Sequence, residues 1–557
     1  MTLALSTHMT GRKQAAGSRW LKLAALTAAL VCVPFLALLF EAVQGSQGLW
    51  SHLAASVLPK AIFDTAILLV GVGILVASMG TGAAWLVTAY EFPGRRTMEW
   101  ALLLPLAVPT YIVAYAYLDI LHPIGPVQGA VRWLLGYSSP REFRLPDIRN
   151  MTGCIVLLGF VLYPYVYVAT RAMFLTQPAS LIEVSRTLGV SRNAVFRRVA
   201  LPLARPAIVV GVSLALMETL NDIGASEFLG VRTLTVSIYT TWVTRSDLPG
   251  ASQLALALLA VVVAIVAAEQ YARRRQRFAP NAQRSGGGLE RQRVSLPKGL
   301  LLLGLCLVPV LVGFVAPAAH LAMEAYARLG FAGLPARFLS DITNTVLFSA
   351  GATLITLVLG SAVAYAARLH SGTSSAWLYR LATIGYAAPG TVVAIGLLIA
   401  LGAFDRTADK VASSWLGFST GLLFLGSGAA LLYAYSTRFL AISAGAMAAG
   451  LSRIPQSLDD VSRMLGENAS GTLRRVHLPL SKTALAASGL LVFVDCIKEL
   501  PATLLLRPLN VETLATHLYG EAARGTYEEA SISALMIVFV ALLPVIWLAR
   551  VGRGGNR

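Results

Sequence analysis

The sequence predicts an all-α polytopic membrane protein, with about twelve transmembrane helices arranged as two parallel six-helix repeats. Three observations predict this fold class. Hydrophobic residues make up 56% of the 557 residues and charged residues only 13%, so soluble domains would expose most of the apolar surface to water. Apolar runs long enough to cross a bilayer recur along the chain. A polar segment of the first half recurs in the second half, and the two copies align without a gap.

Each predicted span is an apolar run close to the length of about 20 residues that crosses a bilayer core. In the first half these runs lie near 21–43, 62–90, 99–121, 151–175, 204–224 and 251–270. In the second half they lie near 299–325, 342–367, 377–401, 414–437, 481–503 and 530–550. The first run is flanked by basic residues and is too long for the core of a signal peptide, so we expect it to be a span.

The two halves are predicted to be two six-span units, 1–272 and 299–557, joined by a linker at 273–298 that is rich in glycine and arginine. Asp64-Thr65 in the first unit matches Asn344-Thr345 in the second, and Pro109 matches Pro389 at the same separation of 280 residues. An even number of spans in each unit places both units in the same orientation. We therefore expect a two-fold axis along the membrane normal.

The formal charge of +18 is spread over the ends of the apolar runs rather than gathered on one soluble domain. Basic residues favour the cytoplasmic ends of spans. This pattern predicts that both termini are cytoplasmic, and it argues against a nucleic-acid partner.

A repeated polar segment lies between the fourth and fifth spans of each unit, at 177–203 and at 454–480; we call these the first and the second polar segment. Both read P-x-S-L-x-(E/D)-V-S-R-x-L-G, with the glycines 277 residues apart. Proline at the start, an early carboxylate and a glycine at the end predict a short helix in each copy. One apolar face is expected on each helix, made of Leu181, Val184 and Leu188 in the first and of Leu458, Val461 and Leu465 in the second.

These apolar faces allow two interpretations. Each face can pack on the ends of the protein's own spans, or it can bind a partner outside the bilayer. Two near-identical copies in otherwise divergent halves favour a two-fold symmetric partner.

The polar segments resemble the EAA loop of ABC importer permeases, in which a coupling helix sits in a cleft of the ATP-binding subunit. The resemblance implies the type I ABC importer permease fold and two copies of an ABC ATPase subunit as partners. It places Glu183 and Asp460 at the acidic position of the motif and Gly189 and Gly466 at its glycine. The chain departs from the pattern by having valine and serine where two alanines are usual. No G-x-x-x-x-G-K-(S/T) phosphate loop is present, so we expect ATP to be bound and hydrolysed by the partners, and no cofactor or catalytic residue in this chain.

Four carboxylates are candidates for a translocation pathway. Glu218 and Asp222 lie in the fifth span, and Asp495 and Glu499 occupy the equivalent positions of the eleventh. A charge inside a bilayer usually faces the bundle interior or a water-filled path, and hard oxygen ligands suit hard cations. Three structural alternatives stay open: Lys498 neutralises Glu499, Asp222 and Glu499 sit at the outer interface, or the pairs brace the two halves.

The segment Lys498–Pro508, which reads K-E-L-P-A-T-L-L-L-R-P, resembles fused permeases of ferric-iron ABC importers, and so does Pro109–Tyr117. This resemblance implies a bacterial inner membrane, a periplasmic substrate-binding protein and Fe3+ as transported solute, with no metal ligand assigned. The alternatives are an ABC permease for an organic solute such as thiamine or a phosphonate, an ion-coupled secondary transporter, and a membrane scaffold or receptor that moves no solute.

Overall fold

The computed structural model describes residues 2–45, 48–176, 192–273, 291–370 and 372–554. In this part of the chain, ten helices are long and apolar enough to span a membrane, and an eleventh span is obtained if one sharply bent helix pair is counted. The protein is therefore an all-α polytopic membrane protein, as predicted.

The helices alternate with short 3-10 or π turns (η). In the first half the elements are α1 (Thr2–Gln44), α2 (Leu49–His52), η1 (Leu53–Val57), α3 (Leu58–Ala89), α4 (Arg95–Ala101), η2 (Leu104–Ala107), α5 (Thr110–Ile120), α6 (Pro126–Leu135), α7 (Met151–Thr176), α9 (Arg192–Val195), η3 (Phe196–Ala200), α10 (Leu201–Asn221), α11 (Gly224–Phe228), α12 (Leu234–Val243) and α13 (Leu248–Arg273).

In the second half they are α14 (Leu296–Val310), η4 (Leu311–Val315), α15 (Ala316–Phe331), α16 (Phe338–Leu369), α17 (Thr373–Thr383), η5 (Ile384–Ala387), α18 (Gly390–Trp415), α19 (Ala429–Ser452), α20 (Gln456–Met464), α21 (Ala469–Thr472), η6 (Leu473–His477), α22 (Leu478–Ile497), α23 (Pro501–Leu506), α24 (Leu514–Arg524) and α25 (Tyr527–Gly554). A short parallel pairing joins β1 (Tyr90–Glu91) to β2 (Gln292–Arg293).

Three predicted spans differ from the helices that form. The run 99–121 is broken before Pro109, and its two parts are bent by 91°. The run 377–401 is likewise broken before Pro389, after which α18 begins. The helix expected at 414–437 begins only at Ala429, because the glycines at 417, 421 and 428 have positive φ and end regular helix there. This helix, α19, is not among the ten apolar spans, since Ser436, Thr437 and Arg438 lie in its middle.

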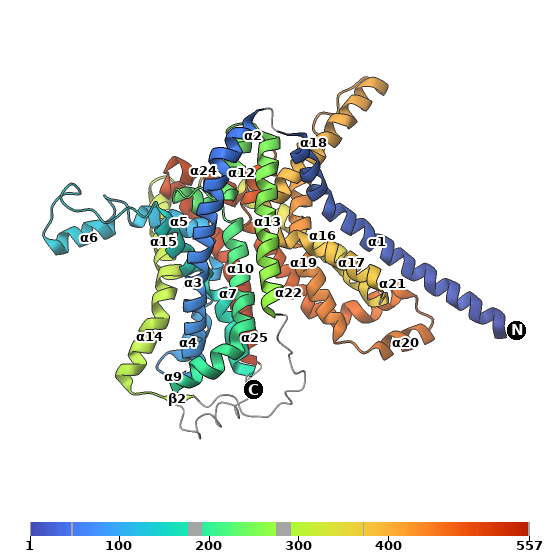
Figure 1. Cartoon of the computed structure of the whole chain (residues 1–557), viewed down its shortest axis with the longest axis horizontal. Helices are drawn as coiled ribbons and strands as arrows, with labels where there is room; N and C mark the ends of the chain where they lie inside the picture. Colours follow the sequence, from blue (N-terminus) through green and yellow to red (C-terminus); the bar gives the residue numbers. More distant parts are fainter. Residues whose placement is uncertain (1, 46–47, 177–191, 274–290, 371, 555–557) are drawn as a thin grey trace. The chain divides into compact units, whose positions relative to one another are not determined.

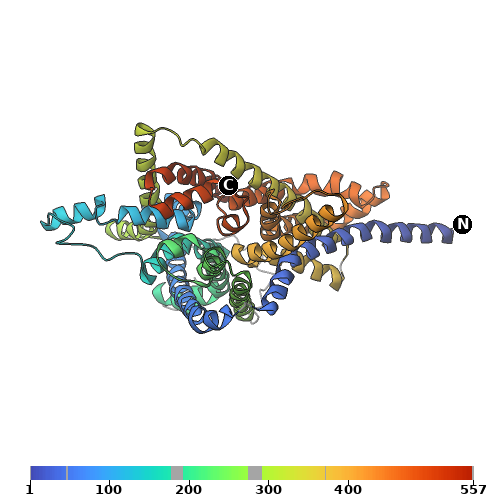
Figure 2. The same cartoon turned by 90° about the horizontal axis from the view of Figure 1, so that it is seen from above.

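The chain forms two compact units, and each draws on both halves of the sequence. The first comprises residues 1–50, 238–256 and 336–516, and the second comprises 51–237, 257–335 and 517–557. In the second unit, α3, α7 and α10 pack side by side, and α15 packs against α5 and α25. In the first unit, α16, α19 and α22 make the equivalent three-helix contact, and α1 packs along α16, α17 and α18 (Figures 1 and 2).

The duplication seen in the sequence is repeated in the helix contacts of the two units. Gly80 on α3 faces the backbone of α7, and Gly360 on α16 faces the backbone of α19. A Cβ at Gly80 would lie 2.8 Å from the Tyr163 carbonyl oxygen, and one at Gly360 would lie 2.8 Å from the Ala444 nitrogen. Small residues of this kind let two membrane helices approach closely. The paired glycines therefore set the spacing of equivalent helices in both units.

A second repeated detail is a threonine that caps a helix far away in the sequence. The Leu234 N–H donates to Thr65 Oγ1 at 3.0 Å, at the start of α12. The Leu514 N–H donates to Thr345 Oγ1 at 2.9 Å, at the start of α24. Each hydroxyl satisfies one of the backbone donors that a helix leaves unpaired at its N-terminus. The matched Thr65 and Thr345 of the sequence thus make the same tertiary contact in each unit.

Candidate functional site

The second polar segment folds as the short helix α20, which begins after Pro455 and ends before a glycine. Gly466 has φ of 86°, a conformation that residues with a Cβ adopt at a cost. The Gly466 N–H donates to the Arg463 carbonyl at 3.0 Å, and the Glu467 N–H donates to the Ser462 carbonyl at 3.1 Å. These bonds satisfy carbonyls that the helix end leaves free. The local structure is the glycine-terminated helix that the sequence predicts.

One face of α20 is apolar and exposed. Its members expose 38% (Leu458), 50% (Val461), 87% (Met464) and 79% (Leu465) of their surface. We call these four residues the exposed stripe. Because the stripe is exposed in this chain, the interpretation that it packs on the protein's own span ends does not describe the second copy.

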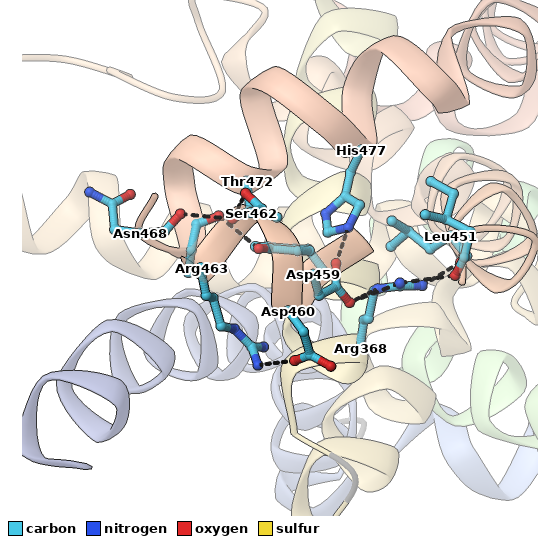
Figure 3. Close-up of polar contacts among 12 residues, drawn as sticks. Arg368, Leu451, Asp459, Asp460, Ser462, Arg463, Asn468, Thr472 and His477 are labelled. Carbon is cyan, nitrogen blue, oxygen red and sulfur yellow. Dashed lines mark hydrogen bonds and ion pairs between the residues drawn. The ribbon is translucent and has the colours of Figure 1, made fainter. Parts of the chain in front are cut away.

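The opposite face of α20 is fixed to the protein by Asp459. Its side chain is 13% exposed, whereas that of the adjacent Asp460 is 70% exposed. Figure 3 shows Asp459 directed towards His477 and Arg368, while Asp460 pairs with Arg463 at the surface. Asp459 Oδ1 lies 2.5 Å from Nε2 of the buried His477, at the end of η6. The neighbouring carboxylates of this helix therefore have different surroundings.

Arg368 connects α20 to two long helices. It lies in the last turn of α16, and its Nε and one terminal nitrogen donate to Asp459 Oδ2 at 3.1 and 2.9 Å. It also donates to the carbonyl of Leu451 in α19 and, at 3.0 Å, to the carbonyl of Ile454 just before α20. An arginine can hold several acceptors at fixed angles because its guanidinium is a planar fork. We call Arg368, Asp459 and His477 the polar clamp.

The turn after α20 is fixed by further polar contacts. Asn468 caps α21 by accepting from the Gly471 N–H at 2.8 Å, and the hydroxyls of Ser462 and Thr472 are 2.9 Å apart. The Tyr365 hydroxyl of α16 donates to the Ala469 carbonyl at 2.7 Å. A displacement of α20 would therefore be felt at α16 and at the start of α22, which runs on from η6.

The first polar segment has different residues at the positions of the polar clamp. At the separations found in the sequence, Thr88, Ile182 and Ala200 match Arg368, Asp459 and His477. The Thr88 hydroxyl donates to the Ala84 carbonyl of its own helix at 2.7 Å. The predicted coupling residues Leu181, Glu183, Val184, Leu188 and Gly189 lie outside the described residues. The two copies thus share the repeated motif but not the residues of the clamp.

Of the predicted pathway carboxylates, Asp222 is buried at the end of α10, where it caps α11. It accepts from the Ser226 N–H at 2.9 Å and from the hydroxyl of Thr110 at the start of α5. A carboxylate at a helix N-terminus is favoured by the free N–H groups and the helix dipole. Asp222 therefore joins α5, α10 and α11 within the second unit.

Glu499 has the equivalent position in the first unit and caps α23. It accepts from the N–H groups of Ala502 at 3.1 Å and Thr503 at 3.2 Å, and its carboxylate pairs with Arg438 of α19. Gly390 makes room for this buried ion pair, since a Cβ there would clash with Glu499 Oε1 and would lie 2.7 Å from Arg438 Nη1. Arg438 thus pairs with Glu499, and Lys498 pairs with Asp495.

The other two predicted pathway residues are half-buried. Glu218 lies near the end of α10. Asp495 lies near the end of α22, where it pairs with Lys498 at 2.8 Å. Asp222 and Glu499 are thus bonded caps, while Glu218 and Asp495 are partly accessible. The pathway role of all four stays a prediction.

Comparison with known proteins identifies the family. The family model described as binding-protein-dependent transport system inner membrane component matches residues 70–278 and 356–551. The chain belongs to this family. The match occurs twice, once in each half, so the protein is a fused permease with two copies of the domain. It is a multi-pass membrane subunit of an ABC importer.

Named relatives differ in what they transport. The Fe(3+)-transport system permease protein FbpB 2 of Haemophilus influenzae is 25% identical over 541 residues, 95% of this chain and 98% of the relative. The molybdenum transport system permease protein ModB of Escherichia coli (strain K12) is 28% identical over 197 residues, 34% of this chain and 82% of the relative. The sulfate transport system permease protein CysW of the same organism is 32% identical over 142 residues, 26% of this chain and 46% of the relative.

Sequence reasoning missed the polar clamp and Arg438. Asp459 and Asp460 are adjacent in the sequence, and a helical wheel places adjacent residues on different faces of a helix. This spacing could have indicated that the two carboxylates have different surroundings. The partners Arg368 and Arg438 come from helices about 90 and 60 residues away, and no local pattern indicates them.

Proposed function

We propose that this chain is the membrane subunit of an ATP-driven importer that moves Fe3+ delivered by a periplasmic binding protein, with one ATPase subunit bound to each polar segment. ATP is bound and hydrolysed by those subunits. Both termini and both polar segments lie on the cytoplasmic side of the bacterial inner membrane. This orientation follows from the arginines that cluster at these segments.

The observation that carries the proposal is the exposed stripe on α20. Exposed apolar patches at one end of a membrane protein mark protein interaction sites, and burying a large apolar side chain contributes about 1.5–3 kcal/mol. The charged Asp460 and Arg463 beside the stripe supply polar contacts at its rim. The polar clamp on the opposite face supports a mechanical role, because a force on α20 acts on α16 and α22 through buried bonds.

Iron as solute is supported by the whole-length relative named for Fe3+ transport and by the carboxylates of the fifth and eleventh spans. Glu218 and Asp495 would offer oxygen ligands to a hard cation along the path.

The coupling test replaces two residues of the exposed stripe, Val461→Glu with Leu465→Glu, and uses Leu509→Glu as the control. Leu509 is 99% exposed but lies outside α20, so the control adds charge to an exposed apolar residue without touching the stripe. We expect the stripe variant to lose at least tenfold in affinity for the cognate ATPase and to stop iron uptake, while the control retains both. Equal ATPase binding and uptake by the two variants would refute the proposed docking.

The transport test uses proteoliposomes that contain the permease, its ATPase and its receptor. We expect iron uptake only with ATP and iron-loaded receptor, and the pair Glu218→Gln with Asp495→Asn should lower uptake while complex assembly persists. Uptake driven by an ion gradient without ATP would instead identify a secondary transporter. ATP-dependent uptake of molybdate or sulfate but not iron would refute the cation as solute.

A further inference from the structure

A cluster of three potential metal ligands lies in the second unit and includes none of the coupling residues and none of the four predicted pathway carboxylates. It consists of Asp119 in the last turn of α5 and of His320 and Glu324 on α15. Their ligand atoms all lie within 4.8 Å of one another, and no other such group of three occurs in the described part of the chain. His320 Nε2 is 2.9 Å from Asp119 Oδ2, and the histidine side chain is 11% exposed.

The two helices bring these groups together by regular geometry. His320 and Glu324 are four residues apart, so they lie on the same face of α15. α5 packs against this helix. The Tyr117 hydroxyl of α5 donates to the Val312 carbonyl at 2.7 Å, and this bond fixes the position of α5 along the segment formed by η4 and α15. Asp119 is thereby held opposite the His320–Glu324 pair.

The cluster lies at the end of the second unit remote from its cytoplasmic side. The continuous helical segment α14–η4–α15 begins at Leu296, next to the strand pair of β1 and β2. His320 is 24 residues further along, which corresponds to about 36 Å of helix and exceeds the bilayer core of about 30 Å. In Figure 1, α5 and α15 lie at the opposite end of this unit from β2. Since α14 begins on the cytoplasmic side in the proposed topology, the cluster faces outward.

The donor set is chemically suited to a cation. Metal–ligand bonds of about 2.1 Å put two ligands of one ion about 3 Å apart when adjacent and about 4.2 Å apart when opposite, so small side-chain rotations would gather all three. Two carboxylates and an imidazole are ligands that iron accepts. Arg328, one turn beyond Glu324, is engaged with Glu529 at 3.0 Å. Glu324 makes no ion pair within the described part of the chain, so its charge stays available.

The packing of these helices does not itself require the cluster. In the first unit α1 packs against α18 as α15 packs against α5, and the residue of α18 that matches Asp119 is Ile399. From Pro34 to Gln44, the last part of α1, Glu41 is the only ionisable residue. The equivalent helix contact forms there without a histidine–carboxylate cluster. A purely structural need would apply equally to both units.

We propose that Asp119, His320 and Glu324 form an outward-facing binding site for the transported iron ion, before it enters the membrane path. The assignment of iron rests on the proposed function, whereas the existence of a cation site rests on the three ligands. The site provides an intermediate position of net negative charge for an ion released by the receptor. Among the described residues the site occurs once, on the second unit.

The test measures iron binding to the purified full-length permease in detergent, without ATPase or receptor, by equilibrium dialysis against ferric citrate and metal analysis. The test variant is His320→Ala with Glu324→Gln. The matched control is His517→Ala with Glu521→Gln, a histidine and a glutamate with the same spacing on α24, 3.7 Å apart. We expect the wild type and the control to bind one more iron per chain than the test variant, whose affinity falls at least tenfold.

A second variant, Asp119→Asn, keeps the side-chain shape and should weaken iron binding by about tenfold without changing the elution volume of the protein. Equal iron binding by wild type, test variant and Asp119→Asn would overturn the site, whatever the complex transports. A different outcome can also be distinguished: iron binding depends on the three residues, but the complex imports an oxyanion and no iron. That result would uphold the cation site and refute the proposed solute. The two conclusions therefore fail separately.

Discussion

Asp459→Asn tests whether the polar clamp holds the coupling helix, and Asp460→Asn is its matched control. Both changes remove one negative charge from adjacent residues of α20 and keep the side-chain shape. Only Asp459 contacts Arg368 and His477, while Asp460 is mostly exposed and pairs with Arg463. We expect the first variant to loosen α20 and the second to leave its attachment unchanged.

The magnitude follows from the burial of the pair. The side chains of Asp459 and Arg368 are 13% and 12% exposed, so solvent screens their attraction only weakly. Breaking a buried ion pair from one side costs about 3–5 kcal/mol, and asparagine retains one acceptor oxygen, so we take about 3 kcal/mol. At 1.4 kcal/mol per factor of ten, the detached form of α20 becomes roughly 100-fold more populated. For the exposed Asp460 pair the expected effect is about 0–1 kcal/mol.

Hydrogen exchange of the amides in 456–480, followed by mass spectrometry of the purified permease, measures this population. Exchange through local opening should become roughly 100-fold faster in Asp459→Asn and stay within about fivefold in Asp460→Asn. In the assembled transporter, Asp459→Asn should also lower the number of solute molecules moved per ATP hydrolysed. Equal exchange rates in the two variants would show that the clamp does not hold the helix.

Three further predictions concern single contacts. Gly466→Ala should destabilise the end of α20 by about 1–2 kcal/mol because φ at this residue is positive, and faster amide exchange at 463–467 would show it. The control is Gly445→Ala on α19, where an added Cβ would meet no atom within 4 Å. Arg438→Met leaves the buried Glu499 charge unpaired and should lower the free energy of unfolding by about 3–5 kcal/mol, measured by thermal unfolding of the solubilised protein. Adding Glu499→Gln should restore part of this stability, and no recovery would contradict the assigned pair. Thr345→Val removes the cap of α24 and should destabilise the start of that helix by about 1 kcal/mol, measured as faster exchange of its first amides. In the control Thr343→Val, the lost hydroxyl bonds only within its own helix, so exchange of those amides should stay unchanged.

Local sequence patterns predicted much of the candidate site and little of its surroundings. The proline, the apolar spacing and the glycine predicted the helix α20 and its end, because all three act through the backbone of neighbouring residues. Leu458 and Val461 were placed on one face for the same reason. What the opposite face contacts was not predicted, since Arg368 comes from another helix and His477 from the turn beyond. The tenth span was misplaced because apolar composition extends through residues whose glycines end the helix.

The pathway carboxylates show the same division. Spacing placed Asp222 and Glu499 at equivalent positions, and in the structure both cap the helix that follows. The sequence could not predict that Thr110 bonds to Asp222 and Arg438 to Glu499, because these partners are determined by the packing of α5 and α19.

The amino-acid sequence by itself determined the membrane class, the duplication and the short helix of the second polar segment, since hydropathy, repeat spacing and backbone preference are properties of contiguous residues. Only the tertiary structure decided which carboxylates are buried caps, which helix face stays exposed and which side chains meet as the Asp119–His320–Glu324 cluster. These features depend on contacts between residues as far as 201 positions apart, whose proximity is produced by helix packing and leaves no periodic signal in the chain.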